Sequence, residues 1–140
     1  MGRIIAIDYG KRRCGIATTD PEKIIANGLT TVDTKELPSF LDNYILKENV
    51  ETIIIGKPLQ VTGKDSESMS FIRPFFKFLS NKYPQIPVEW ADERYTSKMA
   101  FQTMIDSGIS KSARQNKELV DKISATILLQ SYLEMIRDKK

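Results

Sequence analysis

The feature that most constrains the fold is a pair of short apolar segments joined by a basic turn near the start of the sequence. Residues 4–7 are entirely apolar and are followed by Asp8, and residues 14–18 form a second strand-like segment after the turn at 9–13. Two such segments separated by a short polar turn that contains glycine are typical of a β-hairpin. A carboxylate at the end of a core strand has little role in packing. Asp8 is therefore expected to be either a turn-capping residue or a binding or catalytic group.

The order of the expected elements is that of an α/β protein. Three strands come first, joined by short turns that predict an antiparallel arrangement, and helices then alternate with strands. The expected strands are 3–8, 14–19, 25–32, 52–55 and 87–91. The expected helices are 37–47, 66–79, 96–107 and 117–137. Pro74 predicts a kink or a late start in the second helix. Together the elements predict a mixed sheet covered by helices, in a single domain over 1–140.

The absence of histidine limits the chemistry that the chain can perform. With no histidine and one cysteine, Cys14, it has no Ser-His-Asp or Cys-His catalytic group and no imidazole metal site. Acid–base or metal chemistry must therefore rely on aspartate and glutamate, and sites built only of carboxylates favour Mg²⁺ or Mn²⁺. Cys14 lies beside Gly15 in an expected strand, where we expect it to fill the core rather than to act as a nucleophile.

Charge and hydropathy narrow the range of partners. The net charge is only +3, so any contact with nucleic acid must come from local basic clusters, which occur at 11–13 and 111–117. No apolar run approaches the ~20 residues needed to span a bilayer. A single cysteine suits a reducing cytosol. We therefore expect a cytoplasmic protein that does not bind membranes.

Acidic residues stand where several elements begin or end. Asp8 follows the first expected strand and Asp92-Glu93-Arg94 follows the last, and ligands of α/β sheets gather at the carboxyl ends of strands. Helical spacing places Asp121 at the head of an apolar stripe that includes Ala125, Leu128 and Tyr132. Three carboxylates brought together repel one another unless a cation compensates. Two divalent ions bridged by carboxylates are a known arrangement for phosphodiester cleavage.

Simpler explanations remain open for each of these segments. Asp92 or Glu93 could interact with the N-terminus of the next helix. Asp121 could instead pair with an arginine or lysine at the rim of the molecule. Residues 56–66 contain two glycines before a helix, which suits a bound phosphate, but taken alone this segment is better explained as an ordinary strand-to-helix loop.

Taken together, the motifs resemble the YqgF family of the RNase H-like superfamily. The resemblance runs nearly from end to end. It is carried by Asp8-Tyr9-Gly10-Lys11-Arg12 with Gly15 and Ala17, by Gly56, Pro58-Leu59, Gly63 and Ser66, by Asp92-Glu93-Arg94-Tyr95-Thr96, by Val120-Asp121-Lys122-Ile123, and by Leu129-Gln130-Ser131-Tyr132-Leu133. It implies an RNase H-like fold, with a five-stranded mixed sheet of three antiparallel strands followed by parallel strands, and helices on both faces.

The resemblance also implies a set of functional residues. The catalytic carboxylates, which would also bind Mg²⁺ or Mn²⁺, are Asp8, Glu93 and Asp121. The residues that would contact phosphates are Lys11, Arg12 and Arg94. Further basic residues expected to bind nucleic acid are Lys57, which adds a charge to the glycine-containing loop, and Lys111 and Arg114 in the second basic cluster. The chain departs from the family pattern at Tyr95, where leucine is frequent, and at Ser124, where alanine is usual. Lys57 and Tyr95 are expected to affect substrate preference.

The implied activity is that of a metal-dependent nuclease that hydrolyses phosphodiester bonds in structured nucleic acid. The first hypothesis is processing of the 5′ end of pre-16S rRNA during ribosome biogenesis, with pre-rRNA or an assembling ribosomal subunit as the partner. The alternatives are a Holliday junction resolvase that acts on branched, four-way DNA and a catalytically silent module that only binds nucleic acid. The expected oligomeric state is a monomer or a weak homodimer.

Overall fold

The computed structural model of the chain describes residues 2–23, 25–57, 67–92 and 116–138. Its centre is a sheet of five strands in the order β3-β2-β1-β4-β5. The strands are β1 (Arg3–Tyr9), β2 (Arg13–Thr19), β3 (Ala26–Asp33), β4 (Val50–Lys57) and β5 (Val88–Asp92). β1, β2 and β3 are antiparallel, whereas β4 and β5 run parallel to β1. The predicted mixed sheet, antiparallel first and then parallel, is confirmed.

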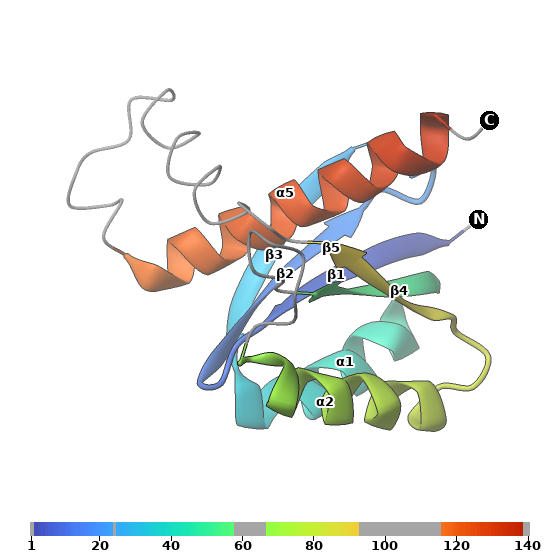
Figure 1. Cartoon of the computed structure of the whole chain (residues 1–140). Coiled ribbons are helices and arrows are strands. Elements are labelled where there is room, and N and C mark those ends of the chain that lie inside the picture. Colours follow the sequence, from blue (N-terminus) through green and yellow to red (C-terminus); the bar gives the residue numbers. More distant parts are fainter. Residues whose placement is uncertain (1, 24, 58–66, 93–115, 139–140) are drawn as a thin grey trace.

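Helices cover both faces of this sheet, as predicted (Figure 1). One face carries the helices α1 (Leu37–Lys47), which follows the short 3₁₀ helix η1 (Thr34–Glu36), and α2 (Met69–Lys82). The other face is crossed by the long helix α5 (Lys117–Asp138). Two separate apolar clusters result, one on each side of the sheet. None of the helices in the described ranges is long and apolar enough to cross a membrane.

Alternation along β1 assigns its side chains to the two layers. Ile5 and Ile7 belong to the cluster under α1 and α2, whereas Ile4 and Ala6 belong to the cluster under α5. Because successive residues of a strand point to opposite faces, Asp8 continues the series of Ile4 and Ala6 and lies on the α5 face. The strand thus delivers a carboxylate to the layer of the long helix.

The carboxyl ends of the three parallel strands meet at one edge of the sheet. Ile7 of β1 pairs with Ile55 of β4, and Lys57 at the end of β4 pairs with Asp92 at the end of β5. Asp8, which follows Ile7, therefore lies at the same edge as Asp92. The expectation that these strand ends converge is confirmed.

Of the two helices expected at 66–79 and 96–107, the structure describes only the first, as α2. Pro74 lies inside α2, which begins at Met69, so the helix starts before the proline rather than at it. The start of the helix was expected at residue 66, which lies outside the described residues, as does the helix expected at 96–107.

Candidate functional site

Asp8 and Asp121 are brought together by Gly15. In the β1–β2 hairpin, Gly15 is the residue directly opposite Asp8, so the two lie on the same face of the sheet. The backbone of α5 passes over this glycine so closely that a Cβ atom built there would lie 2.0 Å from the carbonyl oxygen of Asp121. Only a residue without a side chain permits this approach. Gly15 of β2 therefore lies between Asp8 of β1 and the backbone of Asp121 in α5.

The neighbouring residues hold the end of β1 in place. Tyr9, the residue after Asp8, points to the opposite face and stacks on Phe75 of α2, with ring centroids 4.2 Å apart. Tyr9 is half-buried, and burial is the main cause that raises its pKa. Asp8 therefore stands inside a paired strand.

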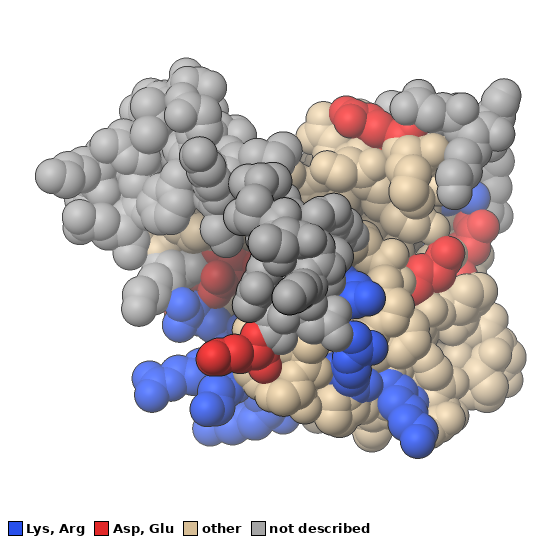
Figure 2. All heavy atoms as spheres, viewed as in Figure 1, with Lys and Arg blue, Asp and Glu red and all other residues tan. Residues whose placement is uncertain are grey.

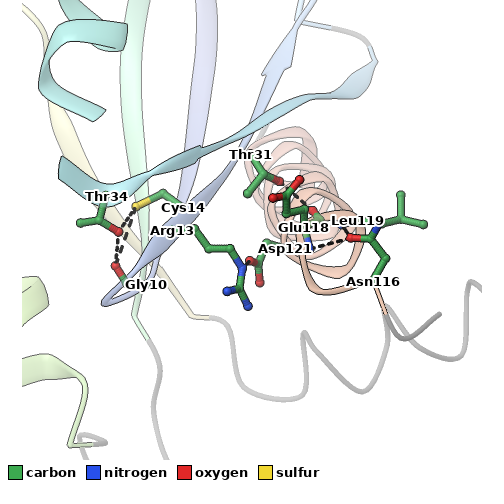
Figure 3. Close-up of polar contacts among 9 residues, drawn as sticks. All are labelled: Gly10, Arg13, Cys14, Thr31, Thr34, Asn116, Glu118, Leu119 and Asp121. Atoms are coloured by element: carbon green, nitrogen blue, oxygen red, sulfur yellow. Dashed lines mark hydrogen bonds and ion pairs between the residues drawn. The ribbon is translucent and has the colours of Figure 1, made fainter. Parts of the chain in front are cut away.

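The first turn of α5 is held by side chains of Asn116, which precedes the helix, and of Thr31 in β3 (Figure 3). Asn116 precedes the helix, and its side-chain oxygen accepts hydrogen bonds from the backbone N–H groups of Glu118 (3.0 Å) and Leu119 (3.2 Å), an N-cap. Thr31 of β3 donates its hydroxyl to the carbonyl oxygen of Glu118 at 2.7 Å. These contacts set the position of Asp121, which follows in the next part of the helix.

Asp121 forms an ion pair with Arg13 of β2, with 2.6 Å between Nε of Arg13 and Oδ2 of Asp121 (Figure 3). The predicted apolar stripe below Asp121 is confirmed, because Ala125, Leu128 and Tyr132 are all buried against the sheet. The alternative in which Asp121 pairs with an arginine also describes the structure correctly. The ion pair lies at the position where the Asp121 backbone contacts Gly15, so the role of Asp121 in a site stays a prediction.

Arg13 is the residue that the sequence reasoning did not single out. It was noted only as one member of the basic turn. The available signal was the alternation along β2, in which Arg13 has the same parity as Gly15 and Ala17, and Ala17 packs under α5. That parity places Arg13 on the helix face, where an acidic partner from α5 can reach it.

A pocket opens between the basic turn and α5. It has a volume of about 380 Å³ and is lined by Gly10, Lys11, Arg12, Arg13 and Asp121. Figure 2 shows lysine and arginine side chains gathered over the tip of the β1–β2 hairpin, at the lower left of the view. Lys11 and Arg12, predicted to contact phosphates, are exposed there. The pocket therefore combines exposed cations with one of the candidate carboxylates.

Cys14 lies beneath the site and has no exposed surface. Burial is the largest cause that raises the pKa of its thiol to about 11, and the charges of Asp8 and Asp121 add to the increase. Hydrogen bonds with the Thr34 side chain and the Gly10 backbone act in the opposite direction. The thiol is consequently protonated near neutral pH, which agrees with the predicted role of Cys14 as core filler.

The other predicted site residues are located elsewhere or are not described. Glu93, Arg94, Lys111 and Arg114 lie outside the described residues. Lys57 lies at the end of β4, where its Nζ is 6.0 Å from the centre of the Trp90 ring. It is at the same edge of the sheet as Asp8 but does not line the pocket of the basic turn.

The donor chemistry of the site fits a divalent cation. Asp8 and Asp121 offer carboxylate oxygens, the ligand type that Mg²⁺ and Mn²⁺ prefer. Within the described part of the chain these two residues stand without a third acidic or sulfur ligand, and no group of three such residues occurs. The third carboxylate implied by the family resemblance, Glu93, belongs to the part that is not described.

Comparison with known proteins gives a consistent result. Residues 2–135 match the protein family described as RuvX, Holliday junction resolvase. A protein of Bacteroides fragilis (strain ATCC 25285) is 56% identical over 98% of this chain and 99% of its own length. A protein of Phocaeicola vulgatus is 58% identical over 96% of each chain, and one of Porphyromonas gingivalis is 52% identical over 96% and 97%. All three relatives carry the name "Putative pre-16S rRNA nuclease".

Proposed function

The chain belongs to the RuvX family of Holliday junction resolvases, and from this membership we propose that it is a metal-dependent nuclease that processes the 5′ end of pre-16S rRNA. A nuclease is a hydrolase that acts on phosphodiester bonds, so the reaction class follows from the family. The choice of RNA rests on the names of relatives that are more than half identical to this chain over nearly its whole length. The proposed substrate implies a cytoplasmic location, with precursor RNA or an assembling ribosomal subunit as the partner.

The single structural observation that supports the proposal is the meeting of Asp8 and Asp121 across Gly15, beside a basic pocket. In the proposed site, Asp8 and Asp121 hold the divalent cation, together with Glu93 as the third carboxylate. A bound divalent cation would lower the pKa of the attacking water and stabilise the charge that develops on the leaving oxygen.

The basic residues of the turn have a different role. Lys11 and Arg12 are exposed on the wall of the pocket that contains Asp121, so they can bind the phosphates of the substrate backbone next to the carboxylates. Arg13 acts through Asp121, because their ion pair orients the carboxylate. Arg94, Lys57, Lys111 and Arg114 are proposed as further contacts to nucleic acid, on the basis of the family resemblance and of charge clustering.

A second candidate substrate is four-way DNA, which the description of the matching family favours. A junction offers two equivalent strands, and a resolvase meets them with two equivalent sites in a two-fold dimer. A monomer or weak homodimer remains our prediction for this chain. The third possibility, binding of nucleic acid without cleavage, is at odds with a pair of carboxylates placed beside the phosphate-binding cations.

The experiment uses the purified protein, an RNA that spans the 5′ end of pre-16S rRNA, and a four-way DNA junction of similar size. Each is incubated with Mg²⁺, with Mn²⁺ and with a chelator. Metal-dependent cleavage of the RNA at a defined position supports the proposal. Paired symmetric nicks in the junction, with the RNA left intact, would favour the resolvase instead. Binding of either substrate without cleavage in any metal would support the silent module.

A further inference from the structure

A second pocket lies on the other side of the basic turn. It has a volume of about 460 Å³ and is lined by Lys11, Arg12, Asp33, Thr34 and Lys35. Lys11 and Arg12 also line the pocket that contains Asp121, so the two pockets adjoin at these residues. The first pocket belongs to the candidate site, whereas the second extends from the hairpin to the beginning of η1. The second pocket has no role in the site described above.

The walls of the second pocket are held together by hydrogen bonds of Thr34. Its backbone N–H donates to the carbonyl oxygen of Arg12 at 2.9 Å, and its hydroxyl donates to the carbonyl oxygen of Gly10 at 2.7 Å (Figure 3 shows the bond to Gly10). Arg13 pairs with Asp33 in the β2–β3 ladder. The basic turn and the start of η1 are therefore fixed relative to each other, which lowers the entropic cost of binding a ligand between them.

The charge of the second pocket suits an anion. Three cations, Lys11, Arg12 and Lys35, face one carboxylate, Asp33. The three cationic side chains are exposed, and none of the ion pairs found among the described residues uses them. Two of the three also face the pocket of Asp121, so one strand of nucleic acid could pass both pockets while contacting the same basic turn.

We propose that this second pocket, with Lys35 as its distinguishing residue, binds a backbone phosphate of the RNA next to the region held at the cleavage site. The strand then crosses the tip of the β1–β2 hairpin, from the Asp121 side to the Lys35 side. This inference rests on the proposed function, because it names the path of the substrate past the same carboxylates. It adds Lys35 to the residues that bind nucleic acid.

The test compares Lys35→Gln with Lys47→Gln. Both substitutions remove one positive charge from an exposed lysine, but Lys47 is in the last turn of α1 and does not line the pocket. Binding to a labelled single-stranded RNA that spans the 5′ cleavage region is measured against salt concentration, with chelator present so that no cleavage occurs. Lys35→Arg is the charge-conserving variant. The RNA is also shortened stepwise to a dinucleotide, which is too short to fill both pockets.

We expect Lys35→Gln to bind the longer RNA several-fold more weakly and to lower the salt slope by about 0.7, the contribution of one phosphate contact to a single strand. Lys47→Gln and Lys35→Arg should bind like the wild type, and the dinucleotide should not distinguish any of the proteins. Equal salt slopes for Lys35→Gln and Lys47→Gln would overturn the second pocket as a phosphate site. A loss of affinity for the dinucleotide in Lys35→Gln that equals its loss of affinity for the longer RNA would overturn it as well.

Cleavage by the same four proteins separates this inference from the proposed function. If Lys35→Gln shows the expected loss of binding but even the wild type fails to cut the RNA with Mg²⁺ or Mn²⁺, the second pocket stands and the proposed nuclease activity on this RNA falls. If the wild type cuts the RNA and Lys35→Gln binds normally, the activity stands and the second pocket falls. Failure of the wild type to bind the RNA at all would overturn both.

Discussion

The carbonyl oxygen of Asp121 lies directly against Gly15, at a distance that leaves no room for a Cβ atom on the strand. This contact lets the beginning of α5 descend onto the hairpin and brings Asp121 next to Asp8, the residue opposite Gly15. Two carboxylates that are far apart in the sequence thus share one end of the sheet. The proposed site therefore depends on a glycine that carries no chemistry of its own.

Replacing Gly15 by alanine should therefore disturb both stability and activity. The added methyl group would overlap backbone atoms of Asp121, so the helix must shift, and overpacking of this kind costs about 1–3 kcal/mol. Gly28→Ala is the matched control, because its Cβ would meet side-chain atoms of Lys122 and Thr126 rather than backbone. Chemical denaturation and RNA cleavage rates are measured for both. Similar losses in the two variants would contradict the special role of Gly15.

The ion pair of Arg13 with Asp121 predicts competition between the guanidinium and a divalent cation. Both side chains are partly exposed, so Arg13→Gln should lower the metal-free free energy of unfolding by only about 1 kcal/mol or less. The same change removes the positive charge that lies beside the Asp121 carboxylate, which leaves that carboxylate available to Mg²⁺. Added Mg²⁺ should therefore stabilise the variant more than the wild type. The readout is thermal unfolding across a Mg²⁺ titration. Arg12→Gln removes the same charge one residue earlier, and an equal gain in that control would refute direct competition.

Asn116 should be needed for the first turn of α5. Asn116→Ala removes the side-chain oxygen that accepts two backbone N–H groups, and loss of such a cap costs about 0.5–2 kcal/mol. Hydrogen exchange should accelerate for the amides of Glu118 and Leu119, and cleavage should slow because Asp121 is held less firmly. Asn116→Asp keeps an acceptor oxygen and should restore most of the stability. If the aspartate variant is as unstable as the alanine variant, capping is not the cause.

The Cys14 thiol should make the free energy of unfolding depend on pH in the alkaline range. Its pKa is raised from 9.0 to about 11 by folding, so the neutral thiol is favoured in the folded state. Its contribution is complete below pH 9 and is lost as the pH rises through about 11, with a magnitude of roughly 3 kcal/mol. The difference in unfolding free energy between wild type and Cys14→Ser isolates this effect from the tyrosines. A difference that stays constant from pH 8 to pH 11 would contradict the prediction.

The elements of the fold followed closely from local patterns in the sequence. The helix expected at 37–47 is α1 with the same bounds, because its apolar residues repeat at helical spacing over its whole length. The strand expected at 52–55 extends to Val50–Lys57, because pairing with β1 and β5 continues beyond the apolar run, through Glu51 to Val50 at one end and through Gly56 to Lys57 at the other. Hydrophobic pattern marks the buried centre of a strand better than its ends.

The candidate site was only partly predictable for a related reason. Strand ends and helix faces indicated where Asp8 and Asp121 would lie. The partner of Asp121 could not be read in the same way, because Arg13 is 108 residues away and only the tertiary fold brings the two together. The second pocket depends likewise on the hydrogen bonds that Thr34 makes to the hairpin. Periodicity indicates the face on which a residue lies, but it does not identify the residue opposite.

Cleavage of the pre-16S rRNA fragment by Asp8→Asn and Asp121→Asn in Mg²⁺ measures whether these two carboxylates are catalytic. Asp42→Asn, on α1 at the opposite face of the sheet, is the control for loss of a carboxylate. Binding of the RNA and thermal unfolding are recorded in parallel. We predict that both site variants fold and bind the RNA but cut it no faster than the background without protein, whereas Asp42→Asn retains turnover. Turnover by folded Asp8→Asn equal to that of the wild type would show that Asp8 is not catalytic.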